Sequence, residues 1–132
     1  ESDLPNLLFV PYIDKEILFA KYYSASDVFM HPSEAEAFSL VMVQALSSEV
    51  PVVAFPVGIA EEAIKHKESG YIARYQDASD LKQGLDYILS LDEEKRTAMG
   101  KIGRQTAVSN FSKEIMVRNH VKLYEEILSR KK

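Results

Sequence analysis

The stretch HPSEAEAFSLVMVQALSSEVPVVAFPVGIAEEA, residues 31–63, decides the fold class. Its apolar run Pro51–Phe55 is rich in β-branched residues and predicts a buried strand. The preceding segment Glu36–Ser47 predicts a helix with apolar positions on most sides, as expected for a helix pressed on a sheet. A turn containing Gly58 then leads into a second helix. This order is typical of a parallel α/β sheet, which binds ligands at the carboxyl ends of its strands.

Strands and helices alternate on both sides of this stretch. Short apolar runs predict three further strands, at Leu7–Tyr12, Val28–His31 and Gly70–Arg74. Between the first two, Asp14 is placed to cap a helix that runs to about Ser24. A short helix is predicted at Glu61–Lys67. Because strand and helix alternate, we predict an α/β fold with a Rossmann-like parallel sheet and flanking helices.

From Asp77 onward the pattern predicts three helices and no strand. Asp77 or Ser79 can cap a helix through about Leu91, and Asp92 can cap a second through about Asn110. Ser112 can cap the last. Gly100 and Gly103 lie inside the second of these helices, where each glycine costs about 1 kcal/mol relative to alanine. With no linker or repeat visible, residues 1–132 are expected to form a single α/β domain.

Composition excludes several classes of protein. The chain has 132 residues, 46% of them apolar and 27% charged, which is ordinary for a globular domain. Its net charge of −4 argues against a nucleic-acid-binding protein, which would carry a basic face. It has no cysteine for disulfides or thiolate metal sites. No apolar run approaches the about 20 residues of a membrane span, and no signal peptide is visible, so a cytoplasmic location is expected.

The segment from Glu36 to Leu40 combines two binding chemistries at a predicted helix start. A carboxylate such as that of Glu36 can accept hydrogen bonds from two hydroxyl groups at once. The unpaired N–H groups of a helix N-terminus attract phosphate. No acidic pair is placed as a divalent-cation clamp, so no metal is implied. No other cofactor is expected.

Four segments resemble the retaining glycosyltransferases of the family 4 (group 1) type: VFMHPSEAEAF (28–38), VPVVAFPVG (50–58), SGYIARYQD (69–77) and NFSKEIMVRNHVKLYEEIL (110–128). The resemblance implies the carboxyl-terminal, nucleotide-sugar-binding half of a GT-B fold, truncated at its amino end. It also implies a missing amino-terminal acceptor-binding domain. The expected reaction is sugar transfer with retention of anomeric configuration, in the cytoplasm or peripherally at the inner face of a membrane.

The resemblance also assigns roles by position. Glu36 would be the catalytic-site residue that contacts the donor-sugar hydroxyls, and Gln44 would meet the ribose. Ser33 borders the same loop. The backbone of four residues would face the sugar and the diphosphate: Phe38, Ser39, Leu40 and Val41. Gly58 and Glu62, at the Gly-containing turn, are the remaining donor-binding positions.

The sequence departs from the family pattern at several of these positions. Ala37 and Ser39 replace glycines, Gln44 replaces the second glutamate of the motif, and Glu49 replaces a glycine that ends the helix. The family's Gly-rich segment with a phosphate-binding Arg and Lys has no counterpart before Leu7. We therefore expect that this chain alone transfers no sugar and binds a donor weakly.

Other interpretations remain open. Ser33 and Glu36 fit a helix capping box, in which Glu36 has only a structural role. The whole chain could be a degenerate domain that binds a sugar nucleotide or a partner protein without catalysis. A phospho-receiver is disfavoured, because acidic residues do not cluster after the first strand. The last helix carries a wide apolar face, from Met116 to Leu128, which predicts self-association.

Overall fold

A three-stranded parallel sheet lies at the centre of the computed structural model, which describes residues 6–130. The strands are β1 (Phe29–His31), β2 (Val52–Ala54) and β3 (Gly70–Ile72), in the spatial order β1-β2-β3. His31 pairs with Ala54, and Ala54 pairs with Ile72, so all three strands end at one edge. This confirms the predicted parallel α/β architecture. The expectation of one domain over residues 1–132 includes residues 1–5 and 131–132, which lie outside the described part.

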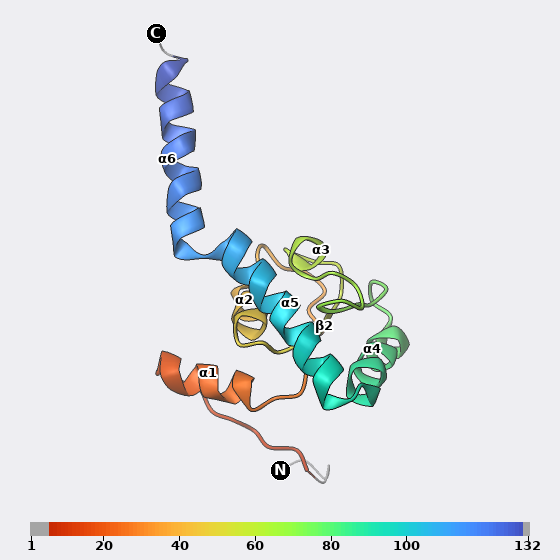
Figure 1. Ribbon diagram of the computed structural model, residues 1–132. Coiled ribbons are helices and arrows are strands. Elements are labelled where there is room, and N and C mark those ends of the chain that lie inside the picture. The colour runs from red at the N-terminus through yellow and green to blue at the C-terminus, as the bar shows by residue number, and fades with distance from the viewer. Residues whose placement is uncertain (1–5, 131–132) are drawn as a thin grey trace.

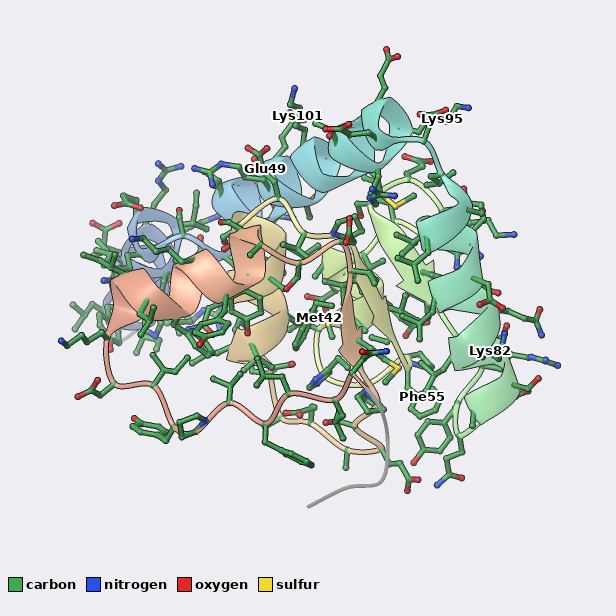
Figure 2. The ribbon with its side chains drawn as sticks, turned by 90° about the horizontal axis from the view of Figure 1, so that it is seen from below. Met42, Glu49, Phe55, Lys82, Lys95 and Lys101 are labelled. Carbon is green, nitrogen blue, oxygen red and sulfur yellow. The ribbon has the colours of Figure 1, made fainter. Side chains whose placement is uncertain are left out.

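Helices cover both faces of the sheet. One face packs on α1 (Glu16–Ser24), α2 (Leu40–Ser47) and α3 (Ala60–Ala63), and the other packs on α4 (Ala78–Ser90). Side chains of β2 alternate between these layers: Val52 and Ala54 belong to the first core, Val53 and Phe55 to the second. Figure 2 shows the strands between α2 on one side and α4 on the other. The continuous apolar run of β2 is therefore explained by burial on both faces.

Helix α5 (Glu93–Phe111) crosses the body and contributes to both cores (Figure 1). Its two glycines lie close to α2 and to the residue Glu49 that follows it. A Cβ on Gly100 would overlap the carbonyl oxygen of Glu49 and lie 2.8 Å from its carbonyl carbon. A Cβ on Gly103 would lie 2.8 Å from a terminal methyl of Leu46. These glycines lower the helix propensity of α5, but they allow it to pack against the end of α2.

The three carboxyl-terminal helices begin where the sequence predicts. The side chains of Asp77, Asp92 and Ser112 each accept a hydrogen bond from a first-turn N–H of α4, α5 and α6 (Lys113–Ser129), respectively. Helix α6 projects away from the body, and none of its residues is buried (Figure 1). Its exposed apolar side chains include Val117, which is 55% exposed, and Tyr124, which is 59% exposed.

Two predictions near the amino end are wrong. Leu7–Tyr12 forms no strand, and Leu8 is 78% exposed. A strand must form hydrogen bonds with a neighbouring strand. Among residues 6–130, β1 pairs only with β2, so the apolar run Leu7–Tyr12 has no strand to pair with. The predicted cap by Asp14 is also absent, because α1 begins at Glu16 after Lys15, whose side chain makes no capping hydrogen bond.

Candidate functional site

Three loops follow the carboxyl ends of the three strands and contact one another. The backbone N–H of Ile59, after β2, donates to the carbonyl of Phe38, after β1, at 3.2 Å. After β3, the hydroxyl of Tyr75 donates to the carbonyl of Glu34 at 3.0 Å, and the side-chain amide of Gln76 donates to the Glu34 carboxylate at 3.0 Å. The predicted binding edge of the sheet is therefore one connected surface.

The helix in the first loop begins later than the sequence predicts. Helix α2 starts at Leu40, and its N-cap residue is Ser39 in the left-handed conformation, with φ 79° and ψ 70°. Glu36 thus lies in the loop before the helix, and the predicted helix start at Glu36 is wrong. The capping-box interpretation fails with it, because Ser33 and Glu36 both precede the N-cap. Ser39 caps no N–H with its side chain, so the first turn of α2 keeps donors without intrahelical partners.

The Glu36 side chain is held between two neighbours. Its Oε1 lies 3.2 Å from Nε2 of His31, and its side chain is 27% exposed. The same Nε2 lies 3.0 Å from Oγ of Ser39, which is buried. The second neighbour is Gly58, with φ 57°, where an added Cβ would lie 3.0 Å from the Glu36 Cβ and 2.9 Å from the Phe38 carbonyl oxygen. Gly58 is therefore required both for its backbone conformation and for this close approach.

A cavity of about 810 Å³ lies beside α2. Val41 and Gln44, one turn apart on α2, form part of its wall. The segment that contains Asp14 forms another part, and aromatic side chains of α1 and β1 complete it, among them Tyr22 and Phe29. An apolar wall with a few polar groups is typical of small-molecule pockets.

The structure brings together some of the predicted residues but not all. Glu36, Phe38, Ser39 and Gly58 form one cluster, and Val41 and Gln44 line the cavity. The other three are placed as follows: Leu40 is exposed at the start of α2, Ser33 is half-buried in the loop after β1, and Glu62 is exposed on α3.

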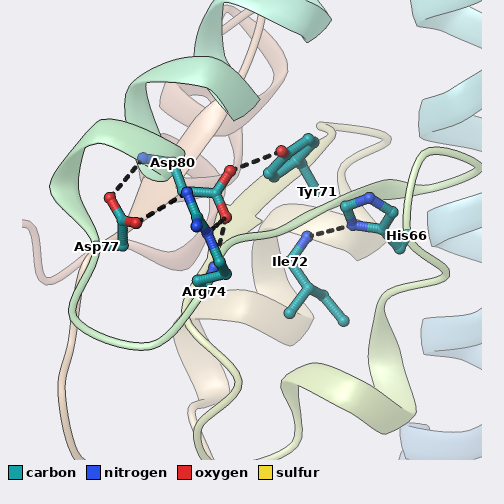
Figure 3. A network of polar contacts seen from close by, with 6 residues as sticks. All are labelled: His66, Tyr71, Ile72, Arg74, Asp77 and Asp80. Atoms are coloured by element: carbon teal, nitrogen blue, oxygen red, sulfur yellow. Dashed lines mark hydrogen bonds and ion pairs between the residues drawn. The ribbon is translucent and has the colours of Figure 1, made fainter.

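A polar network centred on Asp80, in the first turn of α4, ties this helix to β3 and to the third loop (Figure 3). The Asp80 carboxylate accepts from the backbone N–H of Arg74 at 2.8 Å and from the hydroxyl of Tyr71 at 2.8 Å. These hydrogen bonds lower the pKa of Asp80 below its ordinary value, and the one from the Arg74 backbone has the largest effect. The Arg74 guanidinium pairs with both Asp77 and Asp80. Residues 32–39, 55–59 and 73–77 contain no basic residue other than Arg74, so the basic group at this edge is already engaged.

Neither a metal centre nor a membrane span is found in the part of the chain that the structure describes. No three His, Asp or Glu side chains gather as possible metal ligands among those that the structure describes, in residues 6–15 and 17–130. No described helix has the length and apolar character to cross a bilayer.

The family model for group 1 glycosyl transferases matches residues 4–106. The chain belongs to the group 1 glycosyltransferases. Within this family, it is 29% identical over 119 residues to N-acetyl-alpha-D-glucosaminyl L-malate synthase of Bacillus anthracis, covering 90% of this chain and 31% of that enzyme. The chain therefore spans about a third of the length of such relatives.

Solved structures show the same fold. Sucrose-phosphate synthase from Thermosynechococcus elongatus superposes with a TM-score of 0.82 and 33% identity, over 93% of this chain and 30% of that one. Anabaena HepE in complex with UDP-glucose superposes with a TM-score of 0.67 and 24% identity, over 83% of this chain and 29% of that one. These glycosyltransferase neighbours confirm the predicted GT-B fold class.

Sequence reasoning missed two parts of this site. The sequence places His31 at the end of a predicted strand, and the structure shows that its ring contacts the side chains of Glu36 and Ser39. Their spacing of five and eight residues from His31 could have suggested proximity once the helix start was moved to Leu40. The cavity had no sequence signal, because its walls come from segments whose relative positions are set by tertiary packing.

Proposed function

We propose that this group 1 glycosyltransferase chain is the donor-binding domain of a longer, retaining enzyme. The observation that carries the proposal is the placement of Glu36. Its carboxylate lies 3.2 Å from the His31 imidazole and its Cβ lies close to Gly58, at the carboxyl edge of a parallel sheet and next to the start of α2. Such an edge is where open α/β sheets bind ligands. The structure of HepE with UDP-glucose supports a nucleoside diphosphate sugar as the ligand class.

Each part of the donor has a group of suitable chemistry. Glu36 accepts hydrogen bonds from sugar hydroxyls. The diphosphate faces the N–H groups between Phe38 and Val41, where the helix dipole favours negative charge. The nucleoside lies toward the cavity beside α2, with Gln44 near the ribose hydroxyls. Residues 1–132 thus act as one nucleotide-sugar-binding domain, and an acceptor-binding domain is supplied by the rest of the longer protein.

Binding by this chain alone is expected to be weak and to lead to no transfer. Arg74 is the basic residue on the three loops, and its guanidinium is paired with Asp77 and Asp80 rather than directed to a phosphate. Without a basic partner, the diphosphate is attracted only by backbone N–H groups. We expect a Kd in the millimolar range, about −4 kcal/mol.

Amide chemical shifts of the labelled chain, titrated with UDP-glucose and with GDP-mannose, test this proposal. Shifts should concentrate at residues 33–44 and 58–62. Glu36→Gln should weaken sugar binding, while the matched control Glu94→Gln, on α5 at the opposite edge of the sheet, should leave it unchanged. Shifts confined to the helices after Asp77 would show that the site is elsewhere.

A degenerate, non-catalytic binding domain is the second candidate. It is favoured by Ser39, whose side chain is buried at a left-handed position of the helix start, and by Gln44 in place of a carboxylate. Both changes alter groups beside the expected path of the donor. Activity of the longer protein separates the two functions. Donor binding without turnover there would favour the degenerate domain, and turnover that is lost on Glu36→Ala would favour the enzyme.

A further inference from the structure

We propose that His31 is the positioning residue for Glu36, and that sugar recognition at this site depends on a hydrogen carried by Nε2 of His31. This inference rests on the proposed function, because it assigns a role within the same site. It adds a residue on β1 to a site otherwise formed by loops and the start of α2.

The geometry ties one imidazole nitrogen to two side chains. Nε2 of His31 lies 3.2 Å from Oε1 of Glu36 and 3.0 Å from Oγ of Ser39. The His31 side chain is 9% exposed, and its ring stacks on Phe29 with centroids 6.0 Å apart. Its backbone is held by the β1–β2 register, opposite Ala54. The sheet therefore fixes the imidazole, and the imidazole in turn fixes the loop carboxylate.

The chemistry decides where the hydrogen must be. An ionised carboxylate only accepts hydrogen bonds, so Nε2 must carry a hydrogen when Glu36 is charged. With a lone pair on Nε2 instead, two acceptors would face each other at 3.2 Å. The hydroxyl of Ser39 can accept from the same N–H. Because this contact uses Oε1, the second oxygen of Glu36 keeps its capacity to accept from a ligand hydroxyl.

Gly58 completes the arrangement at the base of the Glu36 side chain. Its missing side chain lets the loop after β2 approach the Cβ of Glu36. The carboxylate thus has His31 as a hydrogen-bond donor, and the base of its side chain lies close to the backbone at Gly58; together these restrict its rotamers. A restrained carboxylate loses less side-chain entropy on binding than a free surface glutamate. His31 should therefore affect the sugar part of the ligand and leave the diphosphate part unaffected.

A matched pair of substitutions separates positioning from folding. In His31→Gln the side-chain amide nitrogen can occupy the place of Nε2 and donate to Glu36. In His31→Asn the amide is one carbon shorter and cannot reach. The affinities of the 132-residue chain for UDP-glucose and for UDP are measured by NMR titration, together with those of Glu36→Gln and of the double variant. If UDP-glucose does not bind, GDP-mannose with GDP is the second pair.

The wild-type chain should bind the nucleotide sugar more tightly than the bare diphosphate. His31→Asn should reduce the affinity for the sugar nucleotide about five- to tenfold, the size of one hydrogen bond, and should change that for the diphosphate less than about twofold. His31→Gln should retain most of the wild-type preference. The double variant His31→Asn, Glu36→Gln should lose no more affinity for the sugar nucleotide than the single variants, because each substitution removes the same interaction.

The alternative outcomes are distinct. Equal loss of affinity for sugar nucleotide and diphosphate in His31→Asn would mean a structural role and overturn the proposal, as would no loss at all. A wild-type chain that does not distinguish the two ligands would overturn the proposed function, and the sugar-directed role of His31 with it. Nitrogen chemical shifts of the wild-type imidazole need no variant: a hydrogen on Nδ1 alone overturns the positioning contact whatever the binding result.

Discussion

Gly100→Ala should destabilise the protein markedly, although alanine is the better helix former. Gly100 lies on α5 where this helix meets the backbone just after the end of α2, and Figure 2 shows Glu49 and Lys101 at this junction. An added Cβ would overlap the carbonyl oxygen of Glu49 and lie 2.8 Å from its carbonyl carbon. Both atoms belong to the backbone, so no side-chain rotation can relieve the contact.

The size of the effect follows from the structure of this turn. The N–H of Glu49 donates to the Leu46 carbonyl at 3.0 Å, and that of Val50 to the Ala45 carbonyl at 3.1 Å. Relief of the overlap must displace α5 or weaken one of these bonds. Overpacking costs about 1–3 kcal/mol, and a lost hydrogen bond about 1 kcal/mol. The helix propensity of alanine returns about 1 kcal/mol. If both costs apply, the lost hydrogen bond and the gained helix propensity cancel, and we expect a net loss of about 1–3 kcal/mol in the free energy of unfolding.

Gly103→Ala is the matched control on the same helix. It gains the same helix propensity, but its Cβ would meet a terminal methyl of Leu46, which can rotate. We expect a change within about 1 kcal/mol of wild type. Urea unfolding followed by circular dichroism measures both variants, with equal m-values as the test of a two-state comparison. The reasoning is refuted if Gly100→Ala is as stable as the wild type.

Three further predictions follow from other parts of the structure. Glu49→Gly should stabilise the chain by about 1 kcal/mol in the same assay, since Glu49 holds φ 63° at the end of α2; a loss of stability would contradict this. Hydrogen bonds lower the pKa of Asp80, so its contribution to stability is full above its ordinary pKa of about 3.9 and is lost as pH falls through the folded value. Asp80→Asn should therefore flatten the acid limb of a stability–pH curve, and an unchanged limb would contradict the assignment. The exposed apolar face of α6 should cause self-association, which Val117→Glu reduces in light scattering; a monomeric wild type at high concentration would refute it.

The sequence predicted the sheet and the carboxyl-terminal helices well, because their signals are local. The strand at Pro51–Phe55 was found as β2, Val52–Ala54, from a run that is apolar on both faces. Asp77, Asp92 and Ser112 cap the helices that follow them, as their side chains and positions indicate.

The failures have non-local causes. The apolar run Leu7–Tyr12 carries the composition of a strand, but composition does not supply a pairing partner. The start of α2 was placed at Glu36 because acidic and small residues there fit a helix N-terminus. In the structure, contacts of this segment with His31 and Gly58 keep residues 36–39 out of the helix. Tertiary contacts thus override a local capping signal.

The same distinction applies to the candidate site. The family pattern located the loop of Glu36 and the turn of Gly58, and the structure brings these together. It did not indicate that His31 contacts Glu36, because that contact depends on where β1 ends and how the loop folds back. Nor did it indicate that Gln44 lines a cavity with α1, since the packing of α1 on α2 is not encoded by either segment alone.

The two ends of α2 show how stability and the site can be separated in this chain. Ser39 before the helix and Glu49 after it are both left-handed, at φ 79° and 63°, a conformation that costs a non-glycine residue about 1–2 kcal/mol. The side chain of Glu49 is exposed. It forms an ion pair with Arg104 at the surface, and such pairs contribute little to stability. At Ser39 the side chain that causes the strain also bonds to His31, which holds Glu36. The strain at residue 39 is therefore coupled to the polar arrangement of the site, whereas the strain at residue 49 is not. A glycine at position 49 relieves strain without altering the contacts of Glu36, but a glycine at position 39 also removes a partner of the imidazole.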